Sequence, residues 1–354
     1  MLQSIDEAHL DLEKEKLLLL GLYLREKASF RLCKFFEEND PILIIKSFPY
    51  SEKELVALAK DELKGCERLK ARIIYFKEAD YPEVLKTIPY KPPFLYVIGE
   101  FPKKPTLAVV GTRKPTPYGK QIVESFVPDL VRVRVATVSG LARGIDTFVH
   151  RITLKEGGQT IAVLGTGLDL IYPPENRDLF FKIIDSGSTI VSEYPLKTSP
   201  RRENFPRRNR IVSGLSIGVL VVEAGDKSGT LITAKWAQEQ GKEVFVCPGN
   251  IFSEQSRGTH YLLKNGAIPA TSAQDILFYL GIEHKKIEHK ETQEIQLSQD
   301  ERKILECLTQ YPTHLEELLA DTGYDLSQLL SLLTELELKG LIKSLPGKFY
   351  QRFS

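Results

Sequence analysis

The stretch Asn204-Phe-Pro-Arg-Arg-Asn-Arg-Ile-Val-Ser-Gly-Leu-Ser216 leads directly into the apolar run Ile217-Gly-Val-Leu-Val-Val222. A short apolar run rich in valine and isoleucine predicts a buried strand. From Lys197 to Arg210 six basic residues stand against one acidic residue, Glu203, which gives a local net charge of +5. One interpretation is a solvated loop with scattered ion pairs. Because most of these charges have no local acidic partner, the run favours an anionic ligand, which arginine binds well through its planar, permanently charged fork.

Similar apolar runs recur on both sides of this stretch and alternate with helical segments. The expected strands are Leu107–Val110, Val135–Val138, Thr160–Leu164, Thr189–Val191, Ile217–Val222 and Glu243–Val246. The expected helices are Tyr118–Val131, Ile145–Glu156, Glu175–Ser186, Leu231–Gln240 and Thr259–Asn265. Short apolar strands separated by helices predict an α/β fold with a doubly wound, mostly parallel sheet covered on both faces, of the extended Rossmann-like type.

Loops of small residues follow these strands. They are Gly111-Thr-Arg113, Ser139-Gly-Leu-Ala-Arg-Gly-Ile-Asp146, Gly165-Thr-Gly-Leu-Asp169, Ser192-Glu-Tyr-Pro195 and Glu223-Ala-Gly-Asp-Lys-Ser-Gly-Thr230. Ligands of doubly wound sheets bind beyond the carboxyl ends of the strands. Glycines let backbone amides approach a ligand, and helix N-termini favour anions. Each loop alone is a weak signal, but together with the arginine run they predict a phosphate-lined groove.

The flanks of the sheet domain, residues 71–282, are of different character. Residues 1–70 read as a small helical domain, with either a helix–hairpin–helix-like nucleic-acid role or a packing or oligomerisation role. Residues 283–297 are charged and poor in apolar residues, which predicts a linker. Residues 298–354 contain three helical stretches and a hairpin, the pattern of a winged helix. Its third helix carries Glu335 and Glu337, so protein contact is favoured over DNA reading.

Composition excludes several classes of protein. The net charge of the 354 residues is +1, so any affinity for nucleic acid must come from local patches. The four cysteines form no CxxC pair, so neither a zinc site nor a disulfide framework is predicted, and a reducing cytoplasm fits. No apolar run has the length of a membrane span. Neither a complete Gly-x-Gly-x-x-Gly nor a P-loop is present, so no cofactor is predicted.

Three carboxylates invite a catalytic interpretation. Asp146 and His150 stand at i and i+4 on one expected helix, either as an acid/base or metal pair or as a helix-start carboxylate beside a packing histidine. We favour the second reading. Glu193 and Glu223 follow strands at the ligand edge and could act as bases, but orientation of arginines by ion pairing is favoured for both.

From Tyr81 to Ala273 the chain closely resembles the DNA-processing protein A family, also called Smf. The motifs that carry the resemblance follow one another along this segment. They are Tyr81-Pro82, Pro92-Pro-Phe-Leu-Tyr96, Gly99, Gly111-Thr-Arg113, Ser139–Asp146, Gly165–Asp169, Tyr172-Pro173, Asn176, Ser192-Glu-Tyr-Pro195, Phe205–Ser216, Lys227-Ser-Gly-Thr-Leu-Ile-Thr-Ala234, Pro248-Gly249, Gly258 and Gly266-Ala267. Agreement over so many ordered motifs excludes chance.

The resemblance implies a cytoplasmic, non-catalytic homodimer that binds single-stranded DNA without sequence preference. It further implies protection of incoming DNA and loading of RecA recombinase in natural transformation, without membrane contact. By position, Arg113 is expected to contact phosphate and Phe205 to stack on a base. Asn209 could contact phosphate or a base edge, or make an intraprotein turn bond. The remaining residues carried over to the DNA site are Gly111, Thr112, Ser139, Gly140, Arg143, Gly144, Arg202, Arg207, Arg208, Arg210 and Lys264.

The alternative from another class is a nucleotide phosphoribohydrolase of the "lonely guy" cytokinin-activating type, which shares a related fold. That family uses Pro-Gly-Gly-x-Gly-Thr-x-x-Glu, and here Thr233 stands where its glutamate would be. Threonine cannot supply a carboxylate, so the enzyme interpretation is disfavoured. A structural adaptor with a vestigial groove would leave the basic stretch unexplained.

Overall fold

The computed structural model describes residues 11–28, 30–282, 297–309 and 311–352. The chain forms two compact units, residues 1–283 and 284–354. Apart from Leu297, the predicted linker 283–297 lies outside the described residues.

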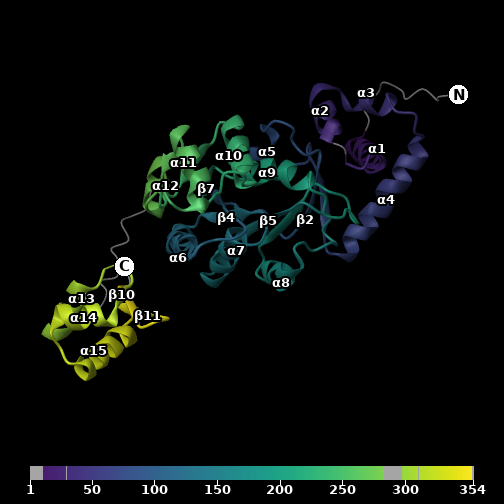
Figure 1. Cartoon of the computed structure of the whole chain (residues 1–354). Coiled ribbons are helices and arrows are strands. Elements are labelled where there is room, and N and C mark those ends of the chain that lie inside the picture. The colour runs from purple at the N-terminus through teal and green to yellow at the C-terminus, as the bar shows by residue number, and fades with distance from the viewer. Residues whose placement is uncertain (1–10, 29, 283–296, 310, 353–354) are drawn as a thin grey trace. The chain divides into compact units, whose positions relative to one another are not determined.

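A nine-stranded sheet in the order β1-β2-β6-β5-β4-β3-β7-β8-β9 forms the frame of the larger unit (Figure 1). Its strands are β1 (Arg72–Tyr75), β2 (Phe94–Ile98), β3 (Thr106–Val110), β4 (Ala136–Ser139), β5 (Thr160–Leu164), β6 (Thr189–Ser192), β7 (Gly218–Val221), β8 (Glu243–Val246) and β9 (Ile268–Pro269). The strands from β6 to β9 in this order run parallel, whereas β2 is antiparallel to both β1 and β6. The predicted doubly wound, mostly parallel sheet is confirmed.

Helices cover both faces of this sheet (Figure 1). One face carries α5 (Glu83–Lys86), α9 (Asn204–Gly214), α10 (Thr230–Glu239) and α11 (Arg257–Lys264), and the other carries α6 (Pro117–Arg132), α7 (Ile145–Lys155), α8 (Arg177–Asp185) and α12 (Ala273–Tyr279). Side chains of each central strand alternate between the two apolar cores: Val109 packs on the α6 and α7 side, Ala108 and Val110 on the α9 and α10 side. This alternation follows from the two-residue period of a strand.

The second part of the basic stretch, from Asn204 onward, is the helix α9, whereas Lys197, Arg201 and Arg202 lie in the loop before it. The first turn of α9 contains Pro206, which is tolerated there because the first amides of a helix have no intrahelical partner. Ile211 and Val212 are buried against the sheet. The helix therefore holds Arg207, Arg208 and Arg210 on a rigid element, with fixed side-chain directions.

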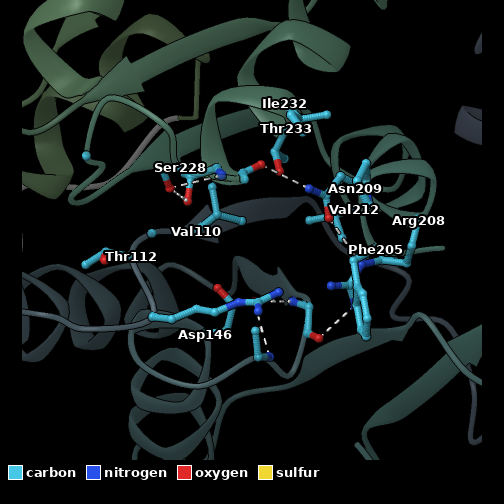
Figure 2. A pocket seen from close by; sticks show the side chains of 18 of the residues that line it. Val110, Thr112, Asp146, Phe205, Arg208, Asn209, Val212, Ser228, Ile232 and Thr233 are labelled. Atoms are coloured by element: carbon cyan, nitrogen blue, oxygen red, sulfur yellow. Dashed lines mark hydrogen bonds between the residues drawn. The ribbon is translucent and has the colours of Figure 1, made fainter. Parts of the chain in front are cut away.

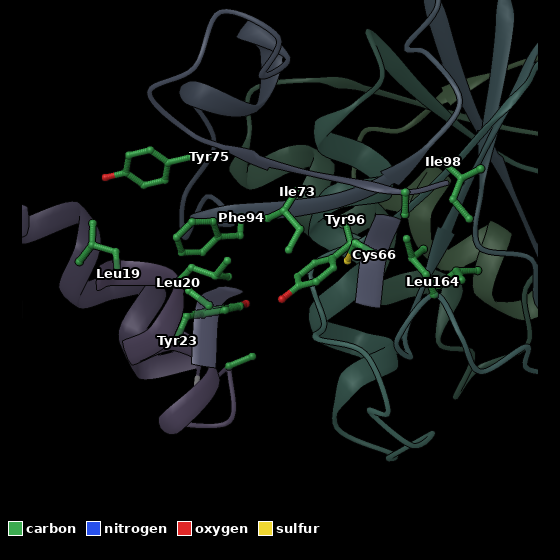
Figure 3. Packing of buried hydrophobic residues seen from close by; sticks show 14 of the residues in the cluster. Leu19, Leu20, Tyr23, Cys66, Ile73, Tyr75, Phe94, Tyr96, Ile98 and Leu164 are labelled. Carbon is green, nitrogen blue, oxygen red and sulfur yellow. The ribbon is translucent and has the colours of Figure 1, made fainter. Parts of the chain in front are cut away.

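Four helices precede the sheet: α1 (Leu12–Arg25), α2 (Phe30–Glu38), α3 (Pro41–Lys46) and α4 (Glu52–Arg68). They pack on the β1–β2 end of the sheet. Leu19, Leu20 and Tyr23 lie against Phe94 and Tyr96 in one apolar core (Figure 3). The sequence predicts a boundary at residue 70, and in the structure the apolar core crosses it.

The second unit contains α13 (Gln299–Cys307), α14 (Leu315–Thr322) and α15 (Leu326–Leu338), with β10 (Thr313–His314), β11 (Ile342–Leu345) and β12 (Phe349–Arg352). The strands form a sheet in the order β10-β12-β11. Apolar residues of the three helices, among them Leu318, Leu329 and Leu336, form a separate core. Three helices and a hairpin form the predicted winged helix.

Candidate functional site

A groove of about 780 Å³ opens at the carboxyl ends of the central strands. Loops after β3, β4 and β7 line it, together with α9 and the start of α10 (Figure 2). The strand order reverses between β3 and β7, because β3 to β6 progress along the sheet in one direction and β7 to β9 in the other. The groove thus occupies the topological switch point, where doubly wound sheets bind ligands. We call it the switch-point groove.

A left-handed glycine brings two of these loops together. Gly144 has φ of 79°, and a Cβ there would collide with the backbone of Thr112 and Arg113. The amide of Ile145 donates to the carbonyl of Thr112 at 3.1 Å, which ties the start of α7 to the loop after β3. No side chain caps the N-termini of α7, α9 or α10. Uncapped helix starts facing a groove create a local preference for anions.

The groove carries an excess of positive charge. Its lining includes five cations, Arg113, Lys114, Arg202, Arg208 and Lys227, and a single carboxylate. Among the residues that the structure describes, the four exposed cations of this set, all but Arg208, form no ion pair. Cations without a carboxylate partner are free to bind phosphate oxygens, and arginine can do so through two hydrogen bonds at once.

An aromatic ring stands beside this charge. Phe205 at the start of α9 lies 5.5 Å from the ring of Tyr172, centroid to centroid, and the guanidinium of Arg113 lies 5.7 Å above its ring centroid. Gly165 leaves room for the ring, since a Cβ there would stand 2.9 Å from Phe205 Cδ1. The groove therefore offers a π-face next to a cation, the two elements that sequence-tolerant single-strand binding needs.

Arg208 braces the groove from within. It is 4% exposed, and its Nη1 donates to the carbonyls of Gly140, at 2.7 Å, and Val163. Asp146, the single carboxylate of the lining, accepts from the amide of Gly140 at 3.0 Å and from that of Ala142 at 3.4 Å. Burial lowers the pKa of Arg208 to about 10, which leaves it charged at neutral pH. Burial raises the pKa of Asp146 and Arg208 opposes that rise.

The helix-start interpretation of Asp146 agrees with this geometry. His150 is buried, and its Nδ1 lies 2.7 Å from Thr160 Oγ1. Burial, together with the charge of Arg208, lowers the pKa of His150 to about 3, so the ring is neutral. His150 is therefore a packing residue inside the fold, as the favoured interpretation of the pair expects.

Glu193 and Glu223 differ from each other. Glu193 binds Arg210 with both carboxylate oxygens, at 2.7 and 2.5 Å, as the ion-pairing prediction requires. Glu223 accepts instead from the amide and hydroxyl of Thr116, at 2.9 and 2.5 Å, so its predicted role in orienting an arginine is wrong. Thr116 is the N-cap residue of α6, so the Glu223 carboxylate lies at a helix N-terminus, where negative charge is favourable.

Arg210, which the sequence assigns to the DNA site, has no exposed surface. Besides Glu193 it donates to the carbonyls of Tyr90, at 2.7 Å, and Arg207, at 2.9 Å. Burial disfavours its charge, but Glu193 outweighs that effect and raises the pKa of Arg210. A guanidinium enclosed in this way cannot reach a phosphate, so we correct its assignment to a structural one. The helical period explains the difference, since positions on α9 alternate between groove and core.

The other predicted site residues lie in the switch-point groove, in an adjoining cavity or outside both. Gly111, Thr112, Arg113, Gly140, Arg202, Phe205, Arg208 and Asn209 line the switch-point groove. Arg143 lines an adjoining cavity, where it pairs with Glu175 at 2.6 Å. Ser139, Gly144, Arg207 and Lys264 do not line the groove. Ser139 is fully buried and its hydroxyl donates to the carbonyl of Val109, which makes it a link between strands and not a DNA contact.

Asn209 spans from α9 to the next loop. Its Nδ2 donates to the carbonyl of Gly229 at 3.2 Å, and its Oδ1 accepts from Arg208 Nε at 3.2 Å. Of the two roles expected for Asn209, a DNA contact or a hydrogen bond within the protein, the structure shows the second.

Sequence reasoning missed Lys114, Lys227 and Tyr172 as groove residues. Both lysines are exposed. Lys114 directly follows the Gly-Thr-Arg loop, and Lys227 lies in the loop after β7. Their position beside strand ends could have predicted that both lysines line the groove. Tyr172 stands in the Tyr172-Pro173 motif of the family resemblance, and this motif was the available signal for a residue that lines the groove and contacts Phe205.

The fold and the groove define a Rossmann-like α/β protein whose switch-point cleft is lined with cations and joined to a winged helix. Within that class, the chain belongs to the DNA recombination-mediator protein A family, whose model matches residues 72–281. The model of the DprA winged helix domain matches residues 288–348. The chain is 38% identical over 313 residues to Protein Smf of Synechocystis, covering 78% of each chain.

Two solved structures are similar to this chain. The first is DNA processing protein A of Streptococcus pneumoniae, with a TM-score of 0.60, 34% identity and coverage of 77% of this chain and 96% of that one. The second is DNA processing protein A of Helicobacter pylori, reported for its single-stranded DNA binding mode, with a TM-score of 0.53, 30% identity and coverage of 60% and 95%. Among the described helices of this chain, none is long and apolar enough to cross a membrane.

Proposed function

We propose that this chain binds single-stranded DNA in the switch-point groove, without sequence preference and without covalent chemistry. The observation that carries the proposal is the set of unpaired cations around Phe205. Phosphates would lie against Arg113, Lys114, Arg202 and Lys227, and a base against the Phe205 ring. Such contacts read the backbone and the π-face of any base, which is why they are tolerant of sequence.

The family supports a wider role for the bound strand. We propose that a cytoplasmic homodimer protects incoming DNA and loads a RecA recombinase onto it during natural transformation. Support comes from membership of a family of recombination mediators and from the single-stranded DNA binding reported for the Helicobacter pylori relative. A mediator needs a groove that holds the strand without altering it. The one carboxylate of the lining, Asp146, is occupied by backbone amides, and Thr233 replaces the glutamate of the phosphoribohydrolases.

The test is fluorescence anisotropy of labelled single-stranded DNA over a salt series, with Arg113→Ala as the variant. Loss of a charge-assisted contact costs about 1.5–3 kcal/mol, a drop in affinity of about 10- to 150-fold. The salt slope should also shrink, by about 0.7 per lost phosphate contact. Arg151→Ala removes another exposed arginine, from α7 and outside the groove, and should bind as the parent does.

Equal affinities of the parent and Arg113→Ala would overturn the groove assignment. If the parent binds no DNA at low salt, nucleoside 5′-monophosphates should be assayed for release of the free base. That release would favour the phosphoribohydrolase alternative.

A further inference from the structure

A second pocket lies against the switch-point groove. It encloses about 220 Å³ between α2, α9 and α10 and is lined mainly by Phe30, Arg207, Lys235 and Trp236. Pro206 and Ile232 belong to the walls of both cavities. A ligand in the groove therefore needs to cross only this shared wall to enter the second pocket, which we call the Phe30–Trp236 pocket.

The pocket is built from fixed aromatic rings. The centroids of Phe30 and Tyr90 are 4.9 Å apart, and those of Tyr90 and Trp236 are 6.2 Å apart with the rings edge to face. The indole Nε1 of Trp236 donates to the carbonyl of Pro206 at 3.2 Å, which holds the ring at the shared wall. Rings held in place present a stacking surface at little entropic cost on binding.

Positive charge surrounds these rings. The guanidinium of Arg207 lies 5.3 Å from the centroid of Phe30, and no carboxylate pairs with it among the residues that the structure describes. Glu239, the acidic residue of the lining, faces Lys235 at 3.7 Å. The local charge thus stays positive, as a phosphate-bearing ligand requires.

We propose that the Phe30–Trp236 pocket is a second base-stacking subsite for the same DNA strand. The strand leaves the switch-point groove over Pro206 and Ile232 and places a further base against Trp236, with Arg207 near its phosphate. Aromatic and arginine side chains also suit protein partners. Continuity with the cation-lined groove favours nucleic acid. The proposal rests on the proposed function, since it extends the path of the strand that the groove binds.

The sequence contains a single tryptophan, Trp236, so fluorescence excited at wavelengths that tyrosine does not absorb reports on this pocket alone. We would titrate the full chain with oligothymidylates of about 5 and about 15 nucleotides, lengths that bracket short and long single-strand sites. Anisotropy of the labelled oligonucleotides would report total binding. The short oligonucleotide should bind with little change in tryptophan emission, whereas the long one should quench it. Binding of the long oligonucleotide without quenching would overturn the subsite and leave the groove intact.

Arg207→Ala supplies the second measurement. Arg207 is half-buried at the rim of the pocket and outside the groove lining, so the variant should fold. We expect its affinity for the long oligonucleotide to fall about tenfold more than its affinity for the short one, the loss expected for one charge-assisted contact to a phosphate. Arg113→Ala, in contrast, should weaken both lengths. Equal losses on both lengths in Arg207→Ala would exclude the second subsite and would leave the pocket to a protein partner.

Discussion

At the scale of single residues, substitution of Phe205 distinguishes the stacking contribution to DNA binding from the contribution of the cations. The Phe205 ring contacts Tyr172 and the guanidinium of Arg113 and carries no charge of its own. Phe205→Ala should weaken single-strand binding by about 1–3 kcal/mol, the usual value of one stacked base. The salt slope should stay that of the parent, because the number of cations is unchanged. Phe205→Tyr keeps the ring and should bind as the parent does.

The measurement is again anisotropy over a salt series. A slope for Phe205→Ala as shallow as that of Arg113→Ala would mean that the ring acts only by positioning Arg113. An unchanged affinity would remove Phe205 from the site.

His150 makes stability depend on pH. The folded chain keeps this buried ring neutral down to a pKa of about 3, whereas an unfolded histidine has the ordinary value of 6.5. Below pH 6.5 the unfolded state takes up a proton that the folded state does not. The free energy of unfolding therefore decreases as the pH is lowered from about 6.5 to about 3. Between pH 7 and pH 5 this one group should lower the unfolding free energy by about 2 kcal/mol.

His150→Asn retains a polar atom that can bond Thr160 and removes the titration. Chemical denaturation at pH 7 and pH 5 should show a smaller loss in this variant than in the parent. The nearby Asp146 and Arg208 are present in both proteins, so their contributions cancel in the comparison. Identical losses would mean that the ring is protonated within the fold.

At the scale of elements, the pair of Glu193 and Arg210 joins α9 to the end of β6. The Tyr23 hydroxyl of α1 donates to the carbonyl of Glu193 at 3.0 Å, so the helical layer meets the same point. Glu193→Gln leaves an enclosed guanidinium without its counter-charge. Removal of one partner from a buried pair costs about 3–5 kcal/mol. Glu175→Gln, which breaks the exposed and solvent-screened pair with Arg143, should destabilise the fold far less.

Urea denaturation of the two variants at neutral pH tests this contrast. Equal, small effects of Glu193→Gln and Glu175→Gln would show that the buried pair contributes no more than a surface pair. Since α9 carries groove residues on its other side, Glu193→Gln should also weaken DNA binding indirectly.

The same helix shows what the sequence could and could not predict. The central strands were predictable because each is an unbroken apolar run such as Thr160–Leu164, which is β5 to the residue. The helix α9 was not, because its arginines interrupt the apolar period that identifies a helix. Arg210 looked like its neighbour Arg208 in the sequence. Its burial depends on Glu193, which lies 17 residues away and becomes a neighbour only in the fold.

Arg113 and Phe205 were predictable as groove residues through the family resemblance, because Arg113 follows an expected strand and Phe205 lies in the family's basic stretch. The order of elements likewise predicted the helical layer, but not that Leu19, Leu20 and Tyr23 share a core with β2. Such a contact between distant segments leaves no local pattern in the chain.

At the scale of the whole molecule, the two units differ in charge. Residues 298–354 contain nine acidic and six basic residues, a net charge of −3. The helix α15, which would be the recognition helix of a winged helix, exposes Leu326 and Leu338, at 51% and 84%. Lys339 at its end is bound to Glu301, at 2.6 Å. Of the residue types that most often read base edges, arginine, lysine, asparagine and glutamine, this helix carries Gln328 alone.

A chain ending at residue 297 should therefore bind single-stranded DNA as tightly as the full chain, or slightly more tightly at low salt, because an acidic module repels phosphate. The larger unit has its own apolar cores and can be measured without the smaller one. Anisotropy of both chains with single-stranded and duplex DNA tests this. A large loss of affinity in the shortened chain would show that the winged helix contacts DNA despite its charge. If affinity is retained, the exposed leucines of α15 favour a protein as the partner of this unit. Loss of recombinase loading by the shortened chain would then favour the recombinase as that protein.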